Sequence, residues 1–261
     1  HLDGSPQFLT PESVITLQAR LGSDMWTTLD ECPPYPCTEE QASKALDRTM
    51  RWTDRSVAAF KRENERTGGG HLFFPILQGS VHGALRRRAA EHIVTADPHG
   101  VAIGGFSVGE AQEQTWTALA QALEALPEGL PRYLMGMGAP EDLWNAAALG
   151  IDMLDCVWPT RVARNGLVMT SRGRLNIKNG VFRADQGPLD PDCACSTCRT
   201  YTRAYLCHLY RAGELASYRY LTIHNVHFNL AAMARIREAI AAGRFAAEHK
   251  AFSEKFRSGI C

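Results

Sequence analysis

The sequence predicts an α/β fold with a parallel β-sheet, and three observations lead to that prediction. Short apolar segments recur along the first half of the chain, and each ends at a glycine or a polar residue. Helical sequence follows each of the first four segments. The segments are apolar without alternation, which is typical of strands buried on both faces. This strand–helix order favours a parallel sheet, either open or closed.

The first elements are bounded by clear local signals. Thr10 followed by Pro11 is typical of a helix start, and this helix is expected to end near residue 21. A β-prone segment at 25–29 comes next, before a proline-rich stretch that excludes regular structure. Thr38 and Gln41 form a capping box, which predicts a long helix to about residue 64.

The remaining strands of this half are expected at residues 72–77, 101–103, 132–135 and 151–154. A helix containing Arg86 follows the first of them, and further helices are expected from near Glu110 and Pro140. In parallel sheets the chemistry gathers at the carboxyl ends of the strands. The residues at those ends are Asp30, Gln78, Gly104, Gly105, Gly136 and Asp155. They could line one pocket, although polar residues and glycines also simply end strands.

The sequence changes character after Asp155. A basic loop is expected at 160–166, followed by hairpins to about residue 192 with turns at 171–173 and 178–180. Helices are then expected at 200–212, 228–242 and 244–256.

Charge is distributed unevenly along the chain. Residues 1–156 carry 12 basic and 21 acidic side chains, and the remaining residues carry 16 basic and 7 acidic ones. The basic part favours a nucleic-acid-binding surface, and the alternative is a chance dipole on an ordinary enzyme. No apolar run is long enough to span a membrane. The 8 cysteines are too few for a disulfide scaffold, so a reducing compartment, the cytoplasm, is expected.

Three thiols lie within six residues, at Cys193, Cys195 and Cys198. This spacing lets several thiolates face one tetrahedral ion, and three Cys with one His form a common structural zinc site. His208 and His224 are both candidates for the fourth ligand. The alternatives are reduced cysteines in a loop and an iron–sulfur centre, for which a suitably spaced fourth Cys is missing.

Several motifs occur together in this chain. They are Asp30-Glu31-Cys32, Gln78-Gly79, Gly104-Gly105, Asp155-Cys156-Val157-Trp158-Pro159-Thr160-Arg161, the cysteine cluster and His224-Asn225. With them the sequence resembles the tRNA-guanine transglycosylases from Leu2 to about Phe256. The resemblance selects His224 as the fourth ligand of one structural Zn²⁺ per chain.

The resemblance implies a (β/α)8 TIM barrel with an inserted zinc-binding subdomain. Strands 4–8 would be present here, and the first three would precede this sequence. Residues 1–160 would form the barrel portion with the active site, 161–227 the basic loop, hairpins and zinc subdomain, and 228–261 helices packing back on the barrel. The family's Asp-Ser-Gly-Gly motif, which carries a second catalytic acid, is absent. We therefore expect a portion of a longer protein rather than a degraded remnant.

The implied activity is the exchange of guanine at the tRNA wobble position for a 7-deazaguanine. By resemblance Asp155 is the nucleophile, which forms a covalent ribosyl ester. The substrate-binding positions would be Asp30, Gln78, Gly104, Gly105, Phe106, Met135 and Gly136. The tRNA-binding positions would be Thr160, Arg161 and Arg164. Val108 resembles bacterial members and implies the aminomethyl (pre-queuosine) base as substrate.

Family members commonly form homodimers, so a homodimer is expected. Its expected partner is tRNA, and no association with a membrane is expected. Two other functions remain open. One is a non-catalytic tRNA-binding or partner subunit of the same family, against which the presence of Asp155, Asp30 and Gln78 argues. The other, reached without the resemblance, is a zinc-stabilised sugar- or nucleotide-processing enzyme that never meets RNA.

Overall fold

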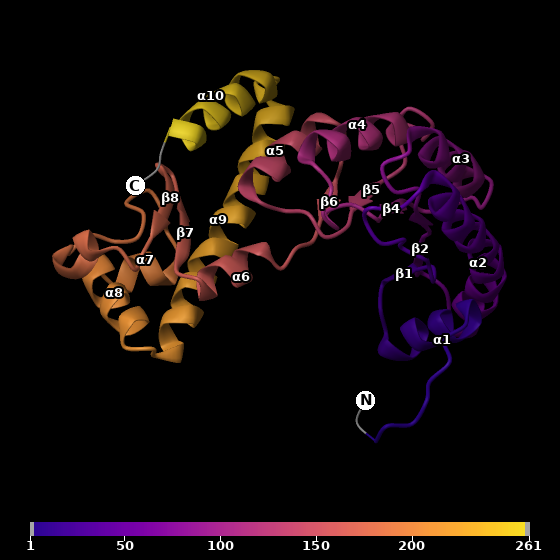
Figure 1. Ribbon diagram of the computed structural model, residues 1–261, viewed down its shortest axis with the longest axis horizontal. Coiled ribbons are helices and arrows are strands. Elements are labelled where there is room, and N and C mark those ends of the chain that lie inside the picture. Colours follow the sequence, from indigo (N-terminus) through magenta and orange to yellow (C-terminus); the bar gives the residue numbers. More distant parts are fainter. Residues whose placement is uncertain (1–2, 259–261) are drawn as a thin grey trace. The chain divides into compact units, whose positions relative to one another are not determined.

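The computed structural model describes residues 3–258 and divides them into two compact units (Figure 1). The first unit comprises residues 3–136 with 149–154, and the second comprises residues 137–148 with 155–258. These unit boundaries differ from the domain boundaries expected near residues 160 and 227. The expected domain division stays a prediction. Residues 259–261 of the expected last part lie outside the described residues.

The first unit alternates helices and strands. Its elements are α1 (Pro11–Leu21), β1 (Met25–Thr27), α2 (Glu39–Arg66), β2 (Leu72–Phe74), β3 (Ile76–Leu77), α3 (Gly83–Val94), β4 (Val101–Ile103), α4 (Gln112–Leu123), β5 (Arg132–Leu134) and β6 (Met153–Leu154). The first two helices begin where their caps predict. The Thr10 side chain accepts the Ser13 amide, and the Thr38 side chain accepts the Gln41 amide.

The strands of this unit pair in parallel, as the sequence predicts. β1 pairs with β2, and a second sheet has the order β3-β4-β5-β6. Pro75 separates β2 from β3, so the single strand expected at 72–77 is two strands with different neighbours. Proline lacks an N–H group, but its carbonyl still accepts the Ala102 amide at 3.0 Å. The second sheet therefore keeps the hydrogen-bond acceptor at Pro75 although the strand is broken there.

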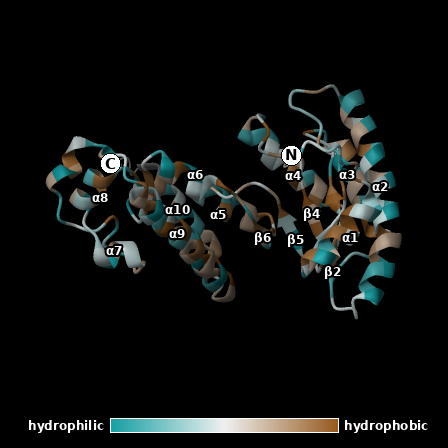
Figure 2. Ribbon diagram, turned by 90° about the horizontal axis from the view of Figure 1, so that it is seen from below, coloured by the Kyte–Doolittle hydropathy of each residue, from teal (hydrophilic) through white to brown (hydrophobic). Residues whose placement is uncertain are grey.

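An aromatic cluster fills the core beneath α1 and α2. Trp26 is fully buried, and its ring lies 5.4 Å from the Phe60 ring in an edge-to-face arrangement. Phe60 stacks in turn on Phe73 of β2 at 4.9 Å. Burying one such side chain contributes roughly 1.5–3 kcal/mol. In Figure 2, hydrophobic residues gather around the strands, while α2 carries hydrophilic residues on its outer side.

The second unit is mostly helical. Its elements are α5 (Pro140–Ala148), α6 (Trp158–Arg164), the antiparallel strands β7 (Leu167–Thr170) and β8 (Gly173–Asn176), the short 3-10 helix η1 (Gly180–Ala184), α7 (Ser196–Thr200), α8 (Arg203–Arg211), α9 (Leu215–Ala241) and α10 (Phe245–Ser258). Its core is formed by buried residues of α6, β7, β8, η1, α8 and α9. They include Ala163, Val168, Leu175, Phe182, Leu206 and Leu221.

Three expectations for this unit are wrong. The second hairpin turn, expected at 178–180, leads into η1 and not into a paired strand of the described residues. The basic segment 160–166 is not a loop, because residues up to Arg164 belong to α6, which has Pro159 in its first turn. Proline is tolerated there, since the first N–H groups of a helix have no intrahelical acceptor. Helix α9 begins at Leu215 and not near residue 228. The hairpin turn at 171–173 is confirmed by the pairing of Thr170 with Gly173.

Within residues 3–258, none of the helices combines the length and apolar character that a bilayer crossing requires. This agrees with the absence of a long apolar run in the sequence.

Candidate functional site

The first unit brings several predicted site residues to one edge of its sheets. Asp30 follows β1, Gln78 follows β3, Gly104 follows β4 and Met135 follows β5. Because neighbouring strands run parallel, their carboxyl ends meet at the same edge. The strand-end residues of distant sequence segments are therefore neighbours, as the sequence predicts.

Asp30 and Gln78 interact directly at this edge. The Gln78 amide Nε2 donates to Asp30 Oδ2 at 2.6 Å, and the Gln78 side chain is almost fully buried. Burial raises the pKa of Asp30, and the hydrogen bond from Gln78 opposes only part of that rise. Gln78 Oε1 is buried without a hydrogen-bond partner in the described structure. The pair is thus a half-buried carboxylate and a buried amide whose Oε1 has no hydrogen-bond partner.

Two glycines allow the backbone after β4 to lie against this pair. A Cβ atom on Gly105 would lie 2.3 Å from Gln78 Oε1, and one on Gly104 would lie 3.0 Å from Gln78 Nε2. Gly105 also has φ +77°, which side-chain-bearing residues rarely adopt. Met135 approaches the same point, with its sulfur 3.7 Å from the position of a Gly104 Cβ. Larger residues at either glycine would displace the amide of Gln78.

The loop after Gly105 is held by Glu110. Its carboxylate accepts the amides of Ser107 at 2.5 Å and Val108 at 2.9 Å, and the Thr115 hydroxyl at 2.7 Å. Burial alone would raise the pKa of Glu110, but these hydrogen bonds outweigh it and lower the pKa. Phe106 is buried, whereas Gly136 is exposed with open space where a Cβ would be.

Asp155 and the predicted tRNA-binding residues belong to the second unit. Asp155 is the first residue after β6 and is exposed. Arg161 and Arg164 are exposed on α6, three residues apart, so they share one face of the helix. Thr160 lies on the same helix, and its hydroxyl donates to the Val157 carbonyl at 3.0 Å.

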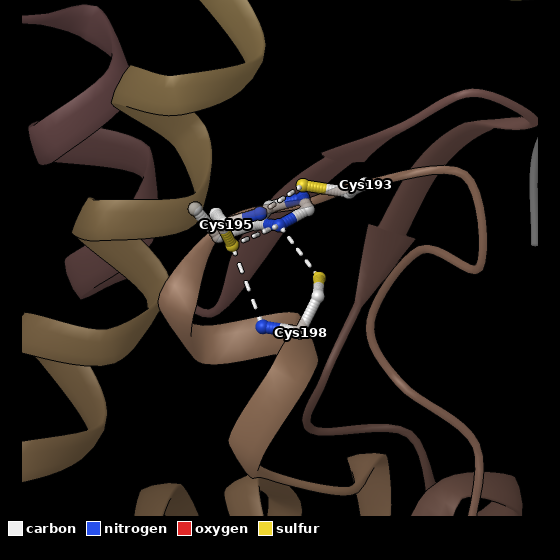
Figure 3. A group of neighbouring side chains, drawn as sticks. Cys193, Cys195 and Cys198 are labelled. Carbon is white, nitrogen blue, oxygen red and sulfur yellow. Dashed lines mark hydrogen bonds between the residues drawn. The ribbon is translucent and has the colours of Figure 1, made fainter.

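The three predicted thiols and His224 form one cluster in the second unit. The ligand atoms of Cys193, Cys195, Cys198 and His224 all lie within 4.8 Å of one another. Figure 3 shows the sulfur atoms of the three labelled cysteines converging from the loop and from the start of α7. The pKa of Cys193 is held well below its ordinary value, chiefly by a hydrogen bond from Cys198. Three thiols and one imidazole suit a tetrahedral ion, and Zn²⁺ favours this donor set.

The His224 ring is oriented for ligation by its second nitrogen. Nε2 lies 2.6 Å from the Met169 carbonyl, which can only accept a hydrogen bond, so Nε2 carries the proton. Nδ1 faces Cys198 Sγ at 3.2 Å and Cys195 Sγ at 3.6 Å, so it is the ring nitrogen that could ligate a metal ion. A carbonyl that fixes the ring in this way is the usual outer partner of a metal-bound histidine. His208, the other candidate, is exposed on α8 and is not part of the cluster.

Comparison with known proteins assigns the family. The sequence profile described as "Queuine tRNA-ribosyltransferase" matches residues 1–258. The chain belongs to this family. It is 49% identical to a queuine tRNA-ribosyltransferase of Desulforudis audaxviator over 94% of the chain and 64% of that relative. Identity is 45% to those of Moorella thermoacetica and Lysinibacillus sphaericus, over 68% and 66% of their lengths. The chain thus spans about two thirds of the length of these queuine tRNA-ribosyltransferases.

The second unit also holds a cavity of about 410 Å³. Residues of α5, α9 and α10 line it, among them Trp144, Phe228, Phe252 and Phe256, together with Asp190, Asp192 and Cys193. Of the predicted site residues only Cys193 lines it. This cavity is therefore separate from the strand-end residues of the first unit.

Asn225 is a structural residue to which the sequence assigns no role. Its Oδ1 accepts the Met169 amide at 3.1 Å, and its Nδ2 donates to the carbonyls of Pro159 and Leu167. It therefore ties α9 to β7 and α6 beside the metal cluster. Its position directly after His224 in the quoted His-Asn motif is the signal that could have identified it.

Proposed function

We propose that the chain carries the tRNA-guanine transglycosylase activity of its family, with Asp155 as nucleophile. The reaction exchanges guanine at the anticodon wobble position for a 7-deazaguanine in queuosine modification. The observation that supports this best is the convergence of Asp30, Gln78 and the Gly104–Gly105 backbone at one sheet edge, in a family member.

This arrangement matches the hydrogen-bonding edge of guanine. A carboxylate such as Asp30 accepts the N1–H and N2–H₂ donors of the base. The second N–H of the Gln78 amide and the Gly105 amide suit the O6 and N7 acceptors. Met135, Phe106 and Gly136 are proposed to border the slot. Val108 leaves room for an aminomethyl substituent, so we assign the pre-queuosine base as the incoming substrate.

Asp155 would act at the anomeric carbon of the wobble nucleotide. Its carboxylate forms a bond to C1′ as the bond from C1′ to guanine N9 breaks, and guanine leaves with that electron pair and takes up a proton. The incoming base then gives up its N9 proton, forms a bond to C1′ and displaces Asp155. The carboxylate is regenerated, so no oxidant or other co-reactant is needed.

The tRNA would be contacted by Thr160, Arg161 and Arg164 of α6. Two exposed cationic side chains on one helix face suit phosphate contacts, and the basic excess of residues 157–261 supports this assignment. The wobble base must leave the anticodon stack to reach the base slot, as in enzymes that flip their target base.

The rest of the assignment follows the family. The parallel strands β1–β6 would be strands 4–8 of a (β/α)8 barrel, with β2 and β3 as two parts of one barrel strand. Cys193, Cys195, Cys198 and His224 would hold one Zn²⁺, which leaves no open position for catalysis and stabilises the fold around it. A homodimer and a cytoplasmic location, where thiols stay reduced, complete the proposal.

The test is guanine exchange into a tRNA with a wobble guanine, using the intact protein and an Asp155→Asn variant. We expect incorporation of labelled guanine and a trapped covalent protein–tRNA adduct in the wild type, with both lost in the variant. The matched control is Asp152→Asn, which changes a neighbouring carboxylate that accepts the Arg132 amide at 2.8 Å. An asparagine retains that acceptor, so activity should be unchanged.

The other outcomes distinguish the alternatives. Incorporation by Asp155→Asn would assign the nucleophile to another residue. Binding of tRNA without incorporation by the wild type would favour the non-catalytic subunit, and an absence of tRNA binding would favour an enzyme that does not act on RNA.

A further inference from the structure

Arg86 of α3 is a buried arginine at the strand-end edge of the first unit. Its side chain is fully buried, in contrast to the neighbouring arginines Arg87 and Arg88, which pair with carboxylates at the surface. Burial lowers the pKa of Arg86 to about 9, which still leaves the guanidinium protonated at neutral pH. A buried charge is costly unless it is fully hydrogen-bonded, so its partners determine what it does.

The partners of Arg86 are backbone carbonyls of the two loops that carry the base-reading groups. Nη1 donates to Gly104 O at 2.7 Å and to Leu77 O at 3.1 Å, and Nε donates to Ser80 O at 2.7 Å. Nη2 donates to Gly105 O at 3.3 Å. One planar cation therefore connects the segment around Gln78 with the Gly104–Gly105 segment.

Two packing features fix the position of the guanidinium. Its central carbon lies 3.8 Å from the centroid of the Phe106 ring, which places the cation over the ring face. At Gly79, a Cβ would lie 2.9 Å from the Arg86 backbone nitrogen. Glycine thus lets the first turn of α3 approach the Gln78 loop closely enough for the arginine to reach it.

These contacts determine which way the loop amides point. In a planar trans peptide the C=O and the following N–H point in opposite directions. Because Arg86 holds the carbonyls of Gly104 and Gly105, the N–H groups of Gly105 and Phe106 must point away from it. Residues 3–258 provide no recorded acceptor for either N–H group. The Gly105 N–H is therefore oriented so that it could donate a hydrogen bond to an acceptor atom of a bound ligand.

We propose that Arg86 is a positioning residue for base selectivity, which fixes the Gly105 N–H as the donor to the 6-oxo group of the bound base. The inference rests on the proposed function and deepens it. Arg86 itself touches no substrate. A preset donor costs no reorganisation on binding and favours bases that have a strong acceptor at this position.

The test compares the affinities of guanine and 6-thioguanine for the intact protein and an Arg86→Lys variant. 6-Thioguanine keeps the N1–H and N2–H₂ donors but has a weak sulfur acceptor at position 6. Lysine keeps the charge but cannot hold several carbonyls in one plane. We expect the guanine Kd to rise about tenfold and the 6-thioguanine Kd to rise by less than about threefold, so that selectivity falls.

Arg132→Lys is the matched control. Arg132 is also a buried arginine of the first unit that donates to backbone carbonyls, those of Leu126 and Pro127, but it lies at the start of β5. The Arg132→Lys variant should leave the affinities for guanine and 6-thioguanine unchanged, and its unfolding temperature should be similar to that of Arg86→Lys. Arg86→Gln, which buries no charge, repeats the comparison if the lysine variant does not fold.

Two results would overturn the inference. One is a guanine Kd in both Arg86 variants within about twofold of wild type, and the other is an equal loss for both bases, as a general distortion of the slot would produce. Exchange by the wild type is measured in parallel. If the wild type binds guanine but does not exchange it, the proposed function fails while the role of Arg86 can still be judged.

Discussion

Asp30 illustrates how one residue's surroundings select its chemistry. The carboxylate can only accept hydrogen bonds, so the Gln78 amide must turn its Nε2 toward it, which leaves Oε1 buried without a partner. The orientation of Gln78 is thus set by Asp30, and we propose that the second N–H of the amide binds the base. Removing the carboxylate would free the amide to turn around.

A pH dependence of base binding follows from this pair. Burial raises the pKa of Asp30 above its ordinary value of 3.8. In the proposed role, the ionised form would accept two donors of guanine and the protonated form fewer, so affinity should be constant at neutral pH. It should then fall as the pH drops through the raised pKa. Guanine Kd values measured from about pH 8 down to about pH 4.5 would show this.

Asp30→Asn is the matched variant for that titration. It should bind guanine about tenfold more weakly at neutral pH and lose the acid-side decline. A wild-type affinity that stays flat over the whole range would contradict the assignment of Asp30 as the group that accepts the base donors.

At the scale of elements, the N-terminal cap of α2 should contribute measurably to the free energy of unfolding. The Thr38 hydroxyl accepts the Gln41 amide at 3.2 Å, and the Gln41 side chain accepts the Thr38 amide at 2.9 Å. Thr38→Ala should lower the free energy of unfolding by about 1 kcal/mol in a denaturant titration. Thr117→Ala, at an exposed site inside α4, should cost nothing, because alanine is the better helix former. Equal losses in both variants would contradict the cap.

The elements that could be predicted are those with local signals. The capped helices α1 and α2 and the strands after residue 100 follow from caps, glycines and apolar runs within a few residues. The start of α9 was not predicted because this helix packs against several elements, among them α6, α7, α8 and β7. A helix covered on several sides shows no single apolar stripe, which is the pattern that identifies a surface helix.

The candidate site also contains some residues that the sequence could predict and others that only the fold reveals. Asp30 and Gln78 could be predicted because strand ends of a parallel sheet share an edge, and the cysteine spacing indicated the metal cluster. Residue spacing alone left His208 and His224 open. The family resemblance selects His224, and the fold agrees, because the His224 ring is buried and His208 is exposed. Arg86 could not be predicted, since nothing local distinguishes it from the two surface arginines that follow it.

At the scale of the whole molecule, the chain consists of two units with separate cores, and the metal cluster belongs to only one of them. The cluster connects the loop at Cys193, helix α7 and helix α9, and through the Met169 carbonyl it also connects β7. These elements surround the core of the second unit. A closed zinc site in such a position contributes its binding free energy to folding.

Removal of the metal should therefore destabilise the second unit selectively. We expect one zinc per intact chain by elemental analysis, and we expect a chelator to lower the unfolding temperature of the protein. Hydrogen exchange should speed up in β7, α7 and α9 and remain slow around Trp26 in the first unit. His224→Ala should reproduce the effect without chelator, since it removes one of four ligands. His208→Ala should keep the metal and the wild-type unfolding temperature, because its exposed ring lies outside the cluster. Uniformly faster exchange in both units would instead mean that their stabilities are coupled, and a zinc content unchanged in His224→Ala would remove that histidine from the ligand set.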